Sequence, residues 1–252
     1  MTKKIKFYFK DIKKLLSTDI YKGLFLFIFL TSIVVNYSMP SDLTFENAIL
    51  YSFGSPLFQL LVMIVLYISS LNTLKIFDTK FSIILRYKNK KQYLSNLLTY
   101  ITLINLVLYI FSILSMLIVL MVAFLGRISF TQFPYYQMPF FVYNIFSVFK
   151  YFIIINLLCI ICILLHKSLN KVFGIVSFAL ILILKEGYSY SIDVITNFKQ
   201  VKLFFGYYLY PFQYSNFSLE VCAMFLQIII LLIICNIIFF FMNKYNKINL
   251  SE

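Results

Sequence analysis

The chain has 252 residues, of which 62% are hydrophobic and 12% are charged, and its formal net charge is +13. A soluble domain of this length needs more polar surface than this composition provides, so a water-soluble fold is excluded. The basic residues cluster beside long apolar stretches and not in a separate domain, which argues against nucleic-acid binding and indicates membrane topology and contact with anionic lipids.

Residues 1–19 predict an amphipathic helix that lies in the membrane interface. One helical face is apolar, and five lysines lie on the opposite face. The apolar residues are Ile5, Phe9, Ile12 and Leu16. The long apolar stretch comes after this segment and has no small-residue cleavage site, so we expect no cleaved signal peptide. A disordered basic tail is the alternative interpretation.

Six apolar stretches predict six transmembrane helices, because about 20 apolar residues are needed to cross the hydrocarbon layer. In lipid only helices and closed barrels satisfy their backbone hydrogen bonds, and long apolar stretches without alternation exclude a barrel. The predicted spans are 20–38, 48–74, 95–125, 140–165, 171–187 and 219–243. The predicted fold class is therefore all-α, with a single transmembrane domain over residues 1–252.

The fifth stretch is the shortest of the six. Its apolar part, residues 172–184, has 13 residues before Lys185 and Glu186 interrupt it, which corresponds to about 20 Å of helix. It either crosses the membrane with its terminal lysines snorkelling to the surface, or it is re-entrant. The basic residues near the C-terminus favour crossing.

The distribution of lysine and arginine predicts the orientation, because these residues gather on the cytoplasmic side. Seventeen of them lie in the N-terminal segment, in the second-to-third and fourth-to-fifth connections and in the C-terminal segment, whereas four lie in the segments predicted to be outside. Both termini are therefore predicted to be cytoplasmic.

Residues 78–91, between the second and third predicted spans, form a polar and basic connection. Phe81, Ile84, Leu85 and Lys88 recur at helical spacing, which predicts a short helix with an apolar edge. A helix outside the membrane must cover such an edge, either with the lipid surface or with a partner protein.

Residues 187–218 are too apolar and aromatic for a free loop. Six tyrosines in this segment are the amphipathic rings expected at headgroup level, and the chain contains no tryptophan to share this role. We expect the segment to dip into the outer leaflet as one or two short helices, broken near Gly206 and Pro211.

The sequence lacks the motifs of most enzymes. It has no P-loop and no HExxH motif, and His166 is its single histidine, so we expect no catalytic residue, no metal site and no cofactor bound by this chain. The four cysteines lie in apolar stretches, and we interpret Cys159 and Cys162 as packing thiols despite their CxxC spacing.

A few polar residues fall inside the spans. Lys150 is predicted to lie in the outer third of the fourth span, where snorkelling outward is favoured over a position in a lumen. Glu220 begins the sixth span, where an acid suits a helix N-terminus. Four amides are interpreted as interhelical hydrogen-bonding groups: Asn105, Asn156, Gln227 and Asn236.

The order of these parts resembles the membrane subunit of ABC transporters of the ABC-2 type. The stretch from Ile84 to Leu94, with Arg86, is similar to the family's arginine-containing segment before the third span, whereas Ile76 to Lys80 stands where the family often has an acidic run with Gly-Thr. Size and the Lys/Asn/Ile bias are similar to small Gram-positive exporters of amphipathic peptides, such as phenol-soluble modulin and bacteriocin exporters.

The resemblance implies a permease subunit of an ATP-driven exporter in the plasma membrane of a bacterium. Residues 78–91 would be the coupling helix that docks on a separate P-loop ATPase, which binds ATP and Mg²⁺. The contact residues would be Asp78, Phe81, Ile84, Leu85, Arg86 and Lys88. A second copy or a sister permease would complete the pathway. The alternatives are a polysaccharide-lipid or drug permease and a non-transporting membrane immunity or scaffold protein.

Overall fold

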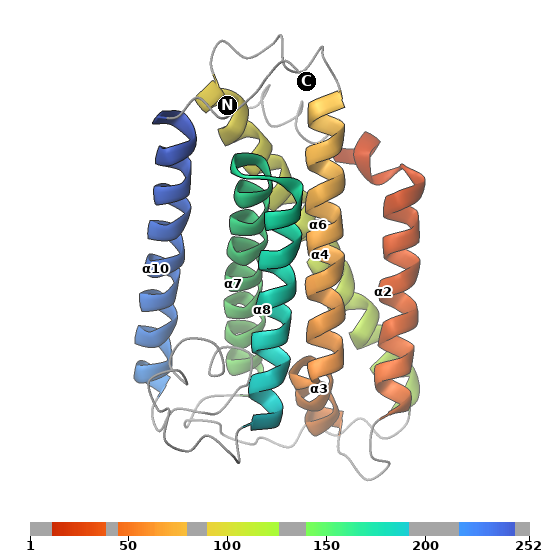
Figure 1. Ribbon diagram of the computed structural model, residues 1–252. Coiled ribbons are helices and arrows are strands. Elements are labelled where there is room, and N and C mark those ends of the chain that lie inside the picture. Colours follow the sequence, from red (N-terminus) through yellow and green to blue (C-terminus); the bar gives the residue numbers. More distant parts are fainter. Residues whose placement is uncertain (1–11, 39–44, 80–89, 126–139, 192–216, 245–252) are drawn as a thin grey trace, which may run out of the picture.

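The structure is a computed structural model, and every regular element among its described residues is an α-helix. The described residues are 12–38, 45–79, 90–125, 140–191 and 217–244. The helices run up and down side by side in one bundle (Figure 1). Their bounds are α2 Asp19–Tyr37, α3 Phe45–Gly54, α4 Pro56–Thr79, α6 Lys90–Ala123, α7 Phe140–Ser168, α8 Lys171–Ser191 and α10 Phe217–Lys244. The all-α fold class is confirmed.

Five helices are long and apolar enough to cross a membrane, namely α2, α4, α6, α7 and α10. Their mean hydropathy lies between 1.7 and 2.9, so the chain is a membrane protein with transmembrane helices. The predicted fifth span corresponds to α8, a continuous helix of 21 residues. Its apolar part within the described side chains, Lys171–Ile183, is shorter than the other five.

The prediction of one continuous helix over 48–74 is wrong, because the helix is interrupted at Ser55, between α3 and α4. Pro56 has no backbone N–H and its ring would clash with the preceding turn, so it can only begin a helix. The Gln59 side chain donates to the Phe53 carbonyl oxygen at 2.9 Å, which satisfies one carbonyl at the end of α3. The crossing element is therefore α4 alone.

Helix directions alternate through the bundle, so that six helix ends lie at the same end of the molecule (Figure 1). These are the start of α2, the end of α4, the start of α6, the end of α7, the start of α8 and the end of α10. They are the ends that adjoin the lysine-rich segments of the sequence. We call this the basic end of the bundle.

Helices α7 and α8 approach each other closely at Gly174. A Cβ atom built on Gly174 would lie 2.5 Å from His166 Cβ and 2.9 Å from the Cys162 carbonyl oxygen. Glycine therefore allows the two backbones to approach, as small residues commonly do between membrane helices. One turn farther along α8, Phe178 stacks on Tyr67 of α4 with ring centroids 3.9 Å apart.

We expect Gly174→Ala to lower the stability of the fold by about 1–3 kcal/mol, because the added methyl group must push α8 away from backbone atoms of α7. The measurement is the thermal unfolding midpoint in detergent. Gly23→Ala is the matched control, since nothing lies within 4 Å of a Cβ at Gly23, and it should leave the midpoint unchanged or raise it. Equal midpoints for both variants would contradict the close approach.

Candidate functional site

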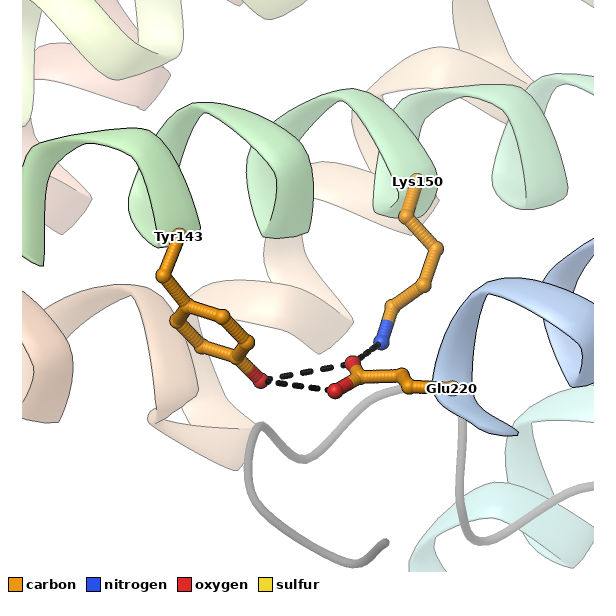
Figure 2. Close-up of polar contacts among 3 residues, drawn as sticks. All are labelled: Tyr143, Lys150 and Glu220. Carbon is orange, nitrogen blue, oxygen red and sulfur yellow. Dashed lines mark hydrogen bonds and ion pairs between the residues drawn. The ribbon is translucent and has the colours of Figure 1, made fainter. Parts of the chain in front are cut away.

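Three polar side chains meet in the interface between α7 and α10 (Figure 2). Tyr143 and Lys150 project from α7 toward Glu220 of α10, and none of the three is more than 3% exposed. Lys150 Nζ forms an ion pair with Glu220 Oε1. The Tyr143 hydroxyl lies 3.3 and 3.2 Å from the two carboxylate oxygens of Glu220, to which it donates. We call these three residues the α7–α10 polar cluster.

Helical periodicity places these residues on facing sides of the two helices. Tyr143 and Lys150 are seven residues apart, close to two helical turns, and Ser147 lies between them on the same face. Glu220 lies in the first turn of α10, where the partial positive charge of the helix N-terminus favours a carboxylate. The cluster is flanked by Phe146, whose ring centroid lies 5.8 Å from Lys150 Nζ.

The prediction that Lys150 snorkels to the membrane surface is wrong. Its side chain is buried and ends on Glu220. An ammonium group buried without a partner costs much more free energy than one paired with a carboxylate. The Lys150 side chain therefore turns toward Glu220 of the neighbouring helix. The sequence did contain a signal, because Lys150 and Glu220 have opposite charges and both fall near the outer ends of their predicted spans.

A second polar cluster lies at the basic end and joins α4, α6 and α7. The Tyr93 hydroxyl donates to Asp78 Oδ1 at 2.5 Å. Lys167 Nζ pairs with the same oxygen, donates to the Tyr93 hydroxyl at 3.1 Å and lies 4.8 Å from the centre of the Tyr93 ring. The Asp78 side chain is 41% exposed and that of Lys167 is 11% exposed. We call these residues the α4–α7 polar cluster.

The α4–α7 polar cluster sits beside the predicted coupling helix. Asp78 is the one predicted coupling residue within the described part of the chain, where it is the next-to-last residue of α4. The other predicted coupling residues fall in 80–89, outside the described residues: they are Phe81, Ile84, Leu85, Arg86 and Lys88. Tyr93 and Lys167, which contact Asp78 from the two neighbouring helices, were not predicted from the sequence.

The predicted interfacial helix is described from residue 12 onward. Residues 12–16 are helical, with Ile12 buried, Leu16 half-buried, and Lys13 and Lys14 exposed. The predicted face is therefore present in this part, and Ile5 and Phe9 lie outside the described residues. Of the predicted re-entrant segment 187–218, only its first residues, which end α8, and its last two, which begin α10, are described.

Two of the four amides join helices as expected. Asn105 of α6 donates to Ser70 Oγ of α4 at 3.0 Å and to Asn156 Oδ1 of α7 at 3.1 Å. Asn105 is fully buried, so these bonds satisfy groups that lipid could not. The interhelical interpretation of Asn236 is wrong, because this exposed residue donates to the Leu232 carbonyl of its own helix at 2.9 Å.

The chemistry of both clusters is that of charge pairing. Within the described ranges, no three side chains of His, Cys, Asp and Glu are grouped so that they could hold a metal ion. The buried Cys159 and Cys162 are free thiols. What both clusters do provide is a specific contact between α7 and another helix, one near each end of α7.

Comparison of the chain with protein-family models, curated proteins and solved structures finds no match.

Proposed function

We propose that this chain is the permease subunit of an ATP-driven exporter, with a separate P-loop ATPase docked on residues 78–91. The observation that carries the proposal is the α4–α7 polar cluster. Asp78 lies in the last turn of α4, Tyr93 in the first turn of α6 and Lys167 in the last turn of α7. A push on the connection between α4 and α6 would therefore reach α7 through two hydrogen bonds and an ion pair.

The arrangement of the bundle supports an exporter that receives energy from the cytoplasm. We take the basic end as cytoplasmic, because lysine and arginine gather there. In this proposal α8 is the sixth crossing, since 21 residues make about 31 Å of helix. Two copies, or one copy and a sister subunit, would then form a pathway of twelve spans.

The lipid-facing character of the helices supports an amphipathic or hydrophobic cargo. The two buried charges of the α7–α10 polar cluster are paired with each other, which gives little support to an internal relay for ion coupling. Peptides and toxins with one apolar face fit such surroundings better than polar solutes. A polysaccharide-lipid or drug permease and a non-transporting immunity or scaffold protein are the competing functions.

Co-purification of the chain with a P-loop ATPase from its native host tests the proposal. We expect a stable complex with the wild-type chain and at least a tenfold loss of bound ATPase after Phe81→Asp or Leu85→Asp, because a carboxylate would be desolvated in an apolar docking edge. Lys90→Ala is the control, because it leaves the apolar edge of the connection intact.

Two outcomes would contradict the proposal. If no P-loop ATPase binds the wild-type chain, a scaffold or immunity protein becomes the better description. If the ATPase binds the two aspartate variants as tightly as the wild type, residues 78–91 are not the coupling helix.

A further inference from the structure

The second half of α10 is less buried than the first half. In the first half Glu220, Met224 and Gln227 are buried, whereas Met242 is the one buried side chain among the described residues after 227. Over the whole helix, 11% of the apolar window is buried inside the bundle, compared with 67% for α7. Figure 1 shows α10 at the edge of the bundle, beside α7. Most of the surface of its second half therefore faces outward.

The outward side of α10 carries a regular stripe of exposed side chains. Successive members are separated alternately by three and four residues, and the four apolar members are between 52% and 61% exposed. The members are Leu226, Ile229, Ile233, Asn236 and Phe240. This is the spacing with which two parallel helices interdigitate along a coiled-coil seam. Helical periodicity places the stripe on the side of α10 opposite the one that packs on α7. We call these five residues the α10 seam.

Asn236 places an amide within this apolar seam. Helix α10 has 28 residues, about 42 Å of helix, whereas the hydrocarbon layer is about 30 Å thick. The layer therefore covers about the central 20 residues of α10, and Asn236, which lies 8 residues before Lys244, is among them. The side chain donates to the Leu232 carbonyl oxygen of its own helix at 2.9 Å. Its second N–H and its oxygen make no hydrogen bond to the described residues.

The unused hydrogen-bonding groups of Asn236 need a partner in the hydrocarbon layer, because lipid tails hold no donor or acceptor. A polar side chain on another transmembrane helix can supply one. An amide offers both a donor and an acceptor, so a second copy of Asn236 complements the first. Two copies in one membrane insert with the same orientation, which makes their α10 helices parallel. A two-fold axis between parallel helices brings each residue opposite its own copy, so one asparagine per chain suffices.

We propose that the α10 seam is the contact of this chain with a second copy of itself, in which Asn236 hydrogen-bonds to the partner's Asn236. Within one chain the amide bonds to its own helix, and the contact proposed here joins two chains. The first half of each α10 stays on its own α7 through the α7–α10 polar cluster, so two complete bundles lie side by side. The pairing follows from α10 alone and holds for an exporter and for a scaffold protein alike. Its failure would leave the docking of an ATPase on residues 78–91 untouched.

Cysteine cross-linking in membrane vesicles tests which side of α10 forms the contact. The background replaces the four cysteines by alanine, and a single cysteine then replaces Ile229 or Ile233 in the seam. Leu232 and Phe241 provide the matched control positions, because they are 43% and 51% exposed but lie beside the seam. With copper phenanthroline as the oxidant, the two seam positions should give disulfide-linked dimers, since parallel seam residues face their own copies. The control positions should give no more than the cysteine-free background.

The dissociation constant of the dimer in lipid vesicles tests the role of Asn236. Energy transfer between donor-labelled and acceptor-labelled copies measures this constant over a range of protein-to-lipid ratios, with the dye on a cysteine that replaces the exposed Lys171. We expect Asn236→Leu to raise the dissociation constant by about 5–30-fold, the equivalent of one interhelical hydrogen bond of about 1–2 kcal/mol. Asn236→Gln keeps an amide and should retain most of the affinity. Both variants should fold as well as the wild type, because residue 236 is exposed.

Three results would overturn the inference. The first is a wild-type chain that stays monomeric at every protein-to-lipid ratio, which would assign the seam to lipid or to a different protein. The second is cross-linking at the control positions as strong as at the seam positions, which would mean that the copies meet through another side of α10 or without a fixed contact. The third is an equal dissociation constant for Asn236→Leu and the wild type, which would mean that the amide does not hold the dimer.

Discussion

Lys150→Met alone is expected to lower the stability of the fold by about 3–5 kcal/mol, the largest loss that we expect from one substitution. Glu220 is 2% exposed and accepts hydrogen bonds from Lys150 and from Tyr143. Without the ammonium group, a carboxylate stays in the bundle with a neutral hydroxyl as its remaining partner in this cluster. Thermal or denaturant unfolding in detergent micelles measures the loss, with tryptophan-free tyrosine fluorescence as the signal.

The double variant Lys150→Met/Glu220→Leu provides the control for this result. Replacing both charges by apolar groups of similar volume is often neutral or stabilising, so the double variant should recover most of the stability lost in Lys150→Met. The two single changes would then be strongly non-additive, as expected for side chains in direct contact. Additive losses, or a single variant as stable as the wild type, would show that the pair is not formed.

The helical elements were largely predictable from the sequence. Apolar stretches of spanning length are governed by one local requirement, the satisfaction of backbone hydrogen bonds in lipid, and α2, α6, α7 and α10 appear close to the predicted bounds. The error at 48–74 arose from counting apolar residues across Pro56. Hydropathy does not register a missing N–H, whereas helix geometry does.

The pairing of helices was not predictable in the same way. Lys150 and Glu220 are 70 residues apart, and nothing in the periodicity of α7 tells which helix covers the face with Tyr143 and Lys150. Each charge therefore received the local interpretation, snorkelling for the lysine and a helix N-terminus for the acid. The second of these is compatible with the structure, because Glu220 is in the first turn of α10 and also binds Lys150.

The hydrogen-bond partners of the amides in the spans were likewise not predictable from the sequence. Their presence in apolar stretches predicts hydrogen bonds, but a carbonyl of the same helix serves as well as a neighbouring helix. Asn105 faces α4 and α7 and bonds to both, whereas Asn236 lies on an exposed face and bonds to Leu232. Only the packing of the bundle distinguishes the two cases.

The two polar clusters join α7 to a neighbouring helix near each of its ends. Lys167 joins α7 to α4 at the basic end, and Lys150 joins α7 to α10 seventeen residues earlier along the same helix, which is about 26 Å. A rigid helix between two ion pairs can carry a displacement from one to the other. We therefore expect that the loss of Lys150 lowers the stability of the fold and that the loss of Lys167 weakens the coupling to the ATPase.

Lys167→Met is expected to leave the fold nearly as stable as the wild type and to reduce the coupling to the ATPase by about 5–150-fold, the usual range of coupling between sites. The stability change should stay within about 1 kcal/mol, because Asp78 is 41% exposed and water replaces the lost ammonium group. The ATP hydrolysis rate of the purified complex, divided by that of the isolated ATPase, measures the coupling.

Lys171→Met is the matched control, since it removes an exposed lysine at the start of α8, also at the basic end. It should change neither stability nor the ratio of hydrolysis rates. If Lys167→Met lowers the ratio no more than Lys171→Met does, then the α4–α7 polar cluster is a local contact and does not transmit the push. If instead Lys167→Met prevents ATPase binding altogether, its role is docking, because a transmitting residue must act after the complex has formed.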